Sequence, residues 1–114
     1  MDNAIYEKSF HFAVRIVNLC KYLQTEQKEY TLSKQILRSG TSIGANVAEA
    51  QQAQSKPDFA SKLNIALKEA KETDYWLRLL HATDYLSDVQ FDSMIIDCDE
   101  LESLLVSIVK TSKQ

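Results

Sequence analysis

The sequence predicts an all-α protein with a single domain, residues 1–114, folded as an antiparallel up-and-down four-helix bundle. The chain contains one proline and two glycines, which is too little turn chemistry for a sheet of many strands. Apolar residues recur at helical spacing in four segments of about 20 to 25 residues. The connectors between these segments are short, so consecutive helices are expected to be antiparallel neighbours.

The first two segments are expected to run from Ala4 to Thr25 and from Leu32 to Gln54, with Thr31 as the N-cap of the second. The first segment carries two apolar stripes, each with the period of a helix. One stripe contains Ile5, Phe12, Ile16, Leu19 and Leu23, and the other contains Phe10, Val14 and Val17.

Ser55 is expected to cap the third segment, with Pro57 and Asp58 in its first turn, and Ser87-Asp88 precedes the fourth. Both segments place apolar residues at steps of four and three, the pattern of a bundle seam. The two seams are Phe59, Leu63, Ala66, Ala70, Thr73, Leu77 and Leu80, and then Met94, Cys98, Leu101, Leu105 and Ile108.

The centre of the second segment, residues 38–50, reads RSGTSIGANVAEA and contains both glycines, Gly40 and Gly44. Glycine inside a helix costs ~1 kcal/mol relative to alanine. A stripe of small side chains lets another backbone approach closely, and the gain in packing can offset that cost. We therefore expect this segment to be covered on more than one side, with the extra cover from another subunit. The core-facing stripe is Ile36, Gly40, Ile43, Val47 and Ala50, and the small-residue stripe is Leu37, Thr41, Gly44 and Ala48.

The polar stripe of the second segment is expected to find partners on the third. A hairpin that turns near residues 54–57 places Arg38 opposite Glu72 and predicts a contact between them. Trp76 lies off the seam, which fits packing at the edge of the core and also fits an anchor in an oligomer interface, the interpretation we favour. The same register puts Ser42 opposite Glu69 and Glu49 opposite Lys62. The candidate polar network or interface is Arg38, Ser42, Asn46, Glu49, Glu69, Glu72 and Trp76.

No catalytic, metal or cofactor motif is found in the sequence, so neither an enzyme nor a small-molecule substrate is indicated. His11 and His81 have no second ligand at metal-site spacing, and the acidic run 97–102 is interpreted as a solvated helix face. Cys20 and Cys98 are expected to be reduced, buried thiols in a cytoplasmic protein. The N-terminus does not resemble a secretion signal, and no apolar run is long enough to span a membrane.

Three stretches resemble a known bacterial family. They are YEKSFHFAVRIVNL near the N-terminus, SIGANVAEA at residues 42–50 and DFASKLNIALKEAKETDYWLRLL at residues 58–80. The chain is similar along nearly its whole length to the 23S rRNA-intervening-sequence proteins. That resemblance implies a left-handed bundle that assembles into a ring-like homopentamer without established enzymatic activity. A related fold, the accessory protein of diversity-generating retroelements, is a basic pentamer that binds nucleic acid and reverse transcriptase.

The chain has a formal net charge of −3, which does not suit a protein held to nucleic acid by bulk charge. Our leading interpretation is a non-enzymatic homo-oligomer with a structural or adaptor role. The alternative is a nucleic-acid-binding accessory protein, in which cations of the third segment repeat around a ring as a basic belt. Those cations are Lys56, Lys62, Lys68, Lys71 and Arg78.

Overall fold

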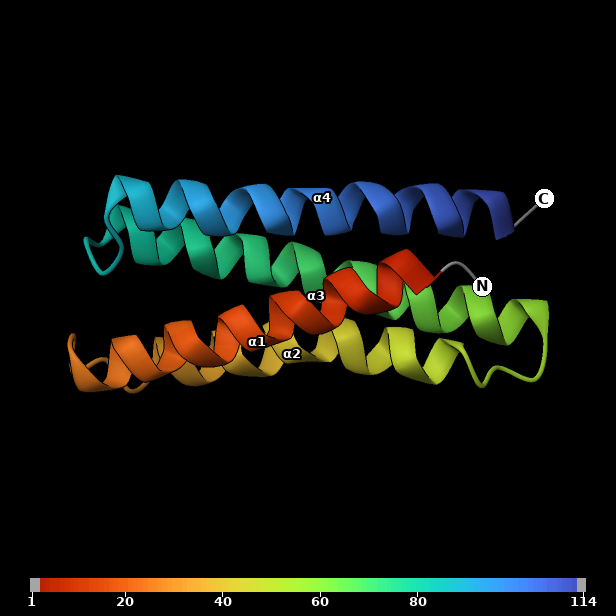
Figure 1. Cartoon of the computed structure of the whole chain (residues 1–114), viewed down its shortest axis with the longest axis horizontal. Helices are drawn as coiled ribbons and strands as arrows, with labels where there is room; N and C mark the ends of the chain where they lie inside the picture. The colour runs from red at the N-terminus through yellow and green to blue at the C-terminus, as the bar shows by residue number, and fades with distance from the viewer. Residues whose placement is uncertain (1–2, 113–114) are drawn as a thin grey trace.

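The computed structural model describes residues 3–112, which form four helices in an elongated bundle of 44 × 20 × 19 Å. They are α1 (Asn3–Thr25), α2 (Leu32–Ala50), α3 (Lys56–Ala82) and α4 (Asp88–Ser112), and the described residues contain no strand. Successive helices run in opposite directions, so α1 begins and α4 ends at the same end of the bundle (Figure 1). The predicted all-α, up-and-down architecture is confirmed.

The four helices pack in chain order around one core. Helix α2 lies against α1 and α3, and α3 lies against α4. Helix α1 runs obliquely to the others (Figure 1) and meets α4 over a shorter stretch than it meets α2. The edge between α1 and α4 is therefore the least extensive of the four helix–helix contacts.

The core contains nearly all of the seam residues that the helical period predicts. The first stripe of α1 and the core-facing stripe of α2 are buried throughout, including Gly40. In α3 every seam residue except Phe59 is buried, and in α4 Val109 replaces the expected Ile108, which is only half-buried. A helix turns once in 3.6 residues, so a step of four after Leu105 reaches the core as readily as a step of three.

The second helix ends at Ala50, four residues before the predicted Gln54. The chain tightens there into three-residue turns, in which Gln52 N–H donates to the Glu49 carbonyl at 3.0 Å and Ala53 N–H to the Ala50 carbonyl at 3.1 Å. The segment from residue 51 to 54 is thus the connector to α3, and the prediction of a longer α2 was wrong.

The helix starts follow the expected caps at two of three positions. Ser55 Oγ accepts from Asp58 N–H at 3.1 Å, and Ser87 exchanges reciprocal hydrogen bonds with Gln90, a capping box. Thr31 occupies the N-cap position of α2, but its side chain makes no capping bond. The carboxylate of Glu29 does so instead, accepting from Ser33 N–H at 2.7 Å and Thr31 N–H at 3.3 Å.

Both glycines of α2 face α1 of the same chain. A Cβ on Gly40 would lie 2.7 Å from Ile16 Cγ1, and one on Gly44 would lie 3.3 Å from the Ser9 carbonyl oxygen. The glycines therefore admit α1 to close range, and their presence requires no second subunit. The expectation that the cover over these positions comes from another subunit is corrected in this respect.

Candidate functional site

The predicted contact between α2 and α3 is present as a three-way ion-pair cluster. Arg38 donates to Glu72 Oε2 and also to Glu69 Oε2 at 3.0 Å. The indole N–H of Trp76 donates to the same Glu72 oxygen at 2.9 Å. The hydrogen bond from Trp76, followed by that from Arg38, outweighs the effect of burial and holds the pKa of Glu72 below its usual value. Glu72 is therefore a fixed anion that joins the two helices.

The rest of the predicted polar stripe is bonded in two different ways. Glu49 pairs with Lys62 at 3.5 Å, as the hairpin register suggests. Ser42 Oγ instead donates to the Arg38 carbonyl at 2.6 Å, and Asn46 Nδ2 to the Ser42 carbonyl at 2.8 Å, so both serve their own helix. The expected placement of Ser42 against Glu69 produces no hydrogen bond between them, because the α2 backbone is the nearer acceptor.

One buried polar contact between α2 and α3 was missed from the sequence. Thr73 Oγ1 donates to Ser39 Oγ at 2.9 Å, and both residues are fully buried. The signal was available, because the hairpin register brings residue 39 opposite residue 72 and so close to Thr73. Together with the Arg38 cluster, this bond fixes the register of the two helices.

The candidate cations of α3 lie on different sides of that helix. Lys62 pairs with Glu49 of α2, whereas Lys71 approaches Glu102 of α4 at 3.6 Å. Arg78 Nε donates to Asp74 Oδ1 at 2.6 Å. Lys56 and Lys68 are exposed and form no ion pair within the part of the chain that the structure describes. Acidic neighbours thus offset three of the five charges proposed for a basic belt.

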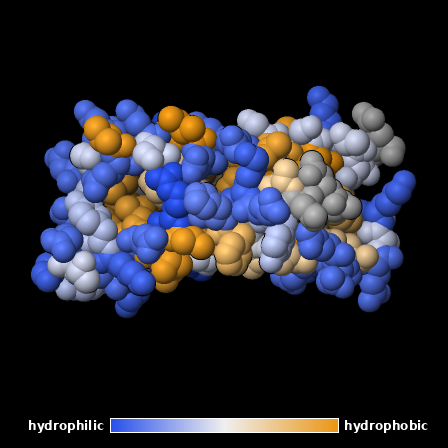
Figure 2. Space-filling model, in the orientation of Figure 1, coloured by the Kyte–Doolittle hydropathy of each residue, from blue (hydrophilic) through white to orange (hydrophobic). Residues whose placement is uncertain are grey.

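An apolar stripe remains exposed on α1. The second stripe predicted from the sequence, joined by Tyr6, lies outside the core: Phe10 is 60% exposed, Val14 45%, and Tyr6 and Val17 37% each. Apolar side chains are visible among hydrophilic ones on the face that α1 crosses (Figure 2). The steps of four, four and three place these residues on one side of the helix.

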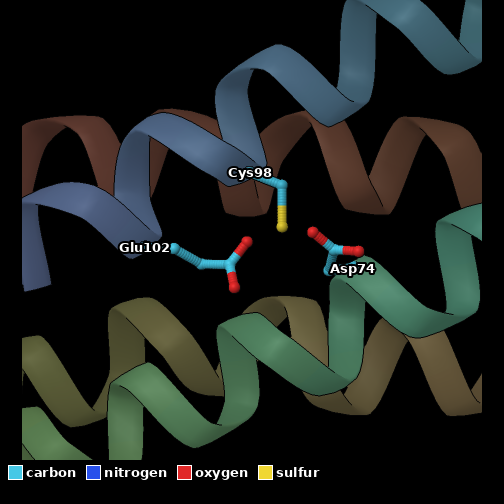
Figure 3. Close-up of side chains that lie close together, drawn as sticks. All are labelled: Asp74, Cys98 and Glu102. Atoms are coloured by element: carbon cyan, nitrogen blue, oxygen red, sulfur yellow. The ribbon is translucent and has the colours of Figure 1, made fainter. Parts of the chain in front are cut away.

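A second titratable cluster joins α3 to α4. Asp74 of α3 faces Cys98 and Glu102 of α4, and one ligand-type atom from each lies within 4.8 Å of the other two (Figure 3). Burial, then the neighbouring Asp74, raises the pKa of Glu102 to about 7. Burial also opposes ionisation of Asp74, but the hydrogen bonds from Arg78 and Glu102 outweigh it and lower its pKa. Glu102 is therefore the carboxyl that carries a proton near neutrality.

The acidic run 97–102 is accordingly not a uniform solvated face. Asp97 pairs with Arg15 and Glu100 with Lys8 across the edge between α1 and α4, at 2.5 and 2.7 Å. Cys98 and Glu102 turn toward α3, and burial raises the pKa of the Cys98 thiol. The sequence did not reveal this cluster, because Asp74 is 24 residues away from Cys98 and only the packing of α3 on α4 brings them together.

The histidines and cysteines show no catalytic grouping. His81 Nε2 lies 2.7 Å from Asp88 Oδ1 and its ring stacks on Phe91, while His11 is exposed. Neither histidine hydrogen-bonds a serine, threonine or cysteine side chain among the described residues. Cys20 and Cys98 are buried free thiols, as expected. In the described part of the chain, no helix combines the length and hydropathy that crossing a membrane requires.

These features define the class of protein: a four-helix bundle whose helix pairs are joined by polar clusters rather than arranged around a cofactor-sized cavity. The chain belongs to the family described as 23S rRNA-intervening sequence protein, whose family model matches residues 1–107. Its fold is similar to the crystal structure of a protein of unknown function from the S23 ribosomal protein family of Bacteroides thetaiotaomicron VPI-5482. The two chains are 61% identical, with 95% of this chain and 96% of that one covered, at a TM-score of 0.93. No match was found among curated proteins.

Proposed function

We propose that this protein is a non-enzymatic building block that associates with copies of itself and serves a structural or adaptor role. The observation that carries the proposal is the exposed apolar stripe of α1, formed by Tyr6, Phe10, Val14 and Val17. Apolar side chains in a single row gain free energy, about 25 cal/mol per Å² buried, when a second surface covers them. A second copy is the occupant we propose, with five copies in a ring as the family resemblance implies.

The polar clusters support this role in a different way. The Arg38–Glu72 pair and the buried Ser39–Thr73 bond are both directed between helices of one chain. They fix helix register and leave no reactive group oriented toward a substrate. A rigid bundle with an apolar outer stripe has the character of a subunit in an assembly.

Light scattering coupled to size-exclusion chromatography tests the proposal. The expected wild-type mass is a multiple of the 13.0 kDa chain, about 65 kDa for a pentamer. Phe10→Glu should shift the mass toward the monomer while the helical circular dichroism is retained. Ile96→Glu is the matched control, since Ile96 is 65% exposed on α4 and should tolerate the charge without loss of assembly. A monomeric wild type at high concentration would overturn the proposal.

Nucleic-acid binding through α3 is the alternative. It draws on Lys56 and Lys68, whereas Lys62, Lys71 and Arg78 already face carboxylates. Binding to ribosomal RNA fragments at increasing salt distinguishes the two functions. A basic belt predicts a log–log slope of several units, and the adaptor role predicts no saturable binding.

A further inference from the structure

We propose that Asp74, Cys98 and Glu102 form a binding site for one divalent ion of the zinc class, held between α3 and α4. The sequence analysis assigned no metal to this protein, and the inference goes beyond the proposed self-association. It rests on the convergence of one sulfur and two carboxylate donors, whose ligand atoms all lie within 4.8 Å of one another.

The two helices determine this convergence. Cys98 and Glu102 are one turn apart on α4, so their side chains project from the same face. Asp74 projects from α3 toward them, and its carboxylate lies across from both (Figure 3). Zinc bonds of about 2.0 to 2.3 Å require donor atoms roughly 3.3 to 3.8 Å apart, which adjustment of the two carboxylate side chains can reach.

The sulfur of Cys98 is the donor that selects the metal. Cys98 is fully buried, and its only hydrogen bond among the described residues is the long donation to the Ala70 carbonyl at 3.4 Å. That bond uses the thiol proton, so no described donor reaches the lone pairs of the sulfur, which points toward the two carboxylates. A thiolate beside carboxylates favours Zn²⁺, Co²⁺ or Cd²⁺ over Mg²⁺ and Ca²⁺, which prefer all-oxygen sites.

The surrounding charge favours a cation. Three carboxyl groups, Asp74, Asp99 and Glu102, gather around the thiol and face the cations Arg78 and Lys71. Arg78 binds Asp74 Oδ1 and Lys71 approaches Glu102 Oε1, so the second oxygen of each carboxylate remains for a metal. The three protein ligands leave a fourth coordination position, which water or Asp99 can fill.

Metal binding exchanges one proton for one bond. The Cys98 thiol loses its proton to solvent as the sulfur–metal bond forms, and no oxidant or reductant takes part. A bound divalent ion lowers the pKa of a coordinating thiol enough to drive this step even in a buried position.

The second cysteine provides an internal control. Cys20 is also buried, and its sulfur donates to the Ser33 carbonyl at 3.2 Å. The Cys98 cluster is the one group of three metal-type ligands found within residues 3–112, and Cys20 is not part of it. A response from thiols in general would therefore involve both cysteines, whereas the proposed site involves Cys98 alone.

The test is titration of the full-length, fully reduced protein with Co²⁺ and Cd²⁺, at mildly alkaline pH and followed by ultraviolet absorption. The wild type and Cys20→Ser should develop a sulfur-to-metal charge-transfer band that saturates at one metal per chain. Cys98→Ser should abolish the band. Asp74→Asn and Glu102→Gln should each weaken binding at least about tenfold, and zinc should displace cobalt.

Two results would overturn the proposal. One is the absence of a band in the reduced wild type, and the other is a band that persists in Cys98→Ser and is lost in Cys20→Ser. Should Cys98→Ser fail to fold, as judged by circular dichroism, the two carboxylate variants decide the matter, because unchanged affinity in both also contradicts the site. Self-association is measured separately, so failure of one proposal leaves the other testable.

Discussion

Glu72 receives a hydrogen bond from each of two different side chains, Trp76 of its own helix and Arg38 of α2. Both donors favour the ionised carboxylate, so the pKa of Glu72 is lower in the folded chain than in the unfolded one. The stabilisation that results is present above the unfolded pKa near 4.5 and is lost as the pH falls through the lower folded value. The contribution of this residue therefore depends on acidity in a defined direction.

Glu72→Gln removes the charge and leaves an amide of similar shape. We expect the variant to be less stable than the wild type at neutral pH, with the difference shrinking as the pH falls below about 4. Urea unfolding at a series of pH values measures this difference. Glu49→Gln is the control, because the 3.5 Å pair with Lys62 is solvent-exposed and worth little. A difference for Glu72→Gln that stays constant down to acid pH would contradict the assignment.

The two glycines of α2 differ in what an added methyl group would meet. At Gly40 a Cβ would approach three atoms of Ile16, all within 2.9 Å, and Ile16 is fully buried. The overpacking cost of about 1 to 3 kcal/mol exceeds the ~1 kcal/mol gained in helix propensity. We expect Gly40→Ala to destabilise the protein by about 1 kcal/mol, measured by chemical unfolding.

Gly44→Ala is the matched comparison in the same helix. Its Cβ would lie 3.3 Å from the Ser9 carbonyl oxygen, a tight contact but not a clash. The propensity gain and the contact cost nearly cancel, so this variant should stay within about 0.5 kcal/mol of the wild type. Equal stability losses at both positions would show that the approach of α1 at Gly40 is looser than the structure has it.

At the scale of the helix, Glu29 begins α2 from outside it. Its carboxylate accepts two backbone N–H groups, at Thr31 and Ser33, which the first turn of a helix leaves without partners. Glu29→Ala should cost about 1 kcal/mol in unfolding free energy, whereas Thr31→Ala should cost almost nothing. The reverse ranking in thermal or urea unfolding would restore Thr31 as the functional cap.

The connectors place non-glycine residues in the left-handed region. Lys28 has φ 54° after α1 and Asp84 has φ 68° after α3. Each closes a six-residue turn, in which Glu29 N–H donates to the Leu23 carbonyl and Tyr85 N–H to the Leu80 carbonyl, both at 2.9 Å. These are the bonds of a Schellman motif, which glycine favours but does not monopolise. A chain with no glycine in these loops can thus still end its helices sharply.

Helical period predicted the interior well, and the limits of that prediction were geometric. The seams of α1, α2 and α3 follow from spacing alone, because a buried stripe must repeat every 3.6 residues. The hairpin register yielded the pairs Arg38–Glu72 and Glu49–Lys62, since a short turn leaves little freedom in alignment. The α4 cluster was not foreseen, because which face of α4 meets Asp74 depends on the rotation of α4 about its own axis. No local sequence signal encodes that rotation.

Considered as a whole, the bundle is closed least firmly between α1 and α4. Arg15 reaches Asp97 at 2.5 Å and the Ser93 hydroxyl at 2.6 Å, and Lys8 reaches Glu100 at 2.7 Å. These ion pairs are partly or fully exposed, and such pairs contribute little to stability. Helix α1 therefore depends chiefly on its contact with α2, unless its outer apolar stripe is covered.

This arrangement predicts a link between assembly and the local stability of α1. In the Phe10→Glu variant, amides of α1 should exchange with deuterium faster than those of α3, because α1 can open without disrupting the rest of the bundle. In the assembled wild type the covered stripe should slow α1 exchange toward the rate of α3. Arg15→Ala, introduced into Phe10→Glu, should accelerate α1 exchange further and leave α3 unchanged. Lys62→Ala in the same background is the control and should leave α1 unaffected, since its partner Glu49 lies on α2. Equal exchange of α1 and α3 in Phe10→Glu would mean that the bundle unfolds as one unit and that the edge between α1 and α4 is as firm as the others.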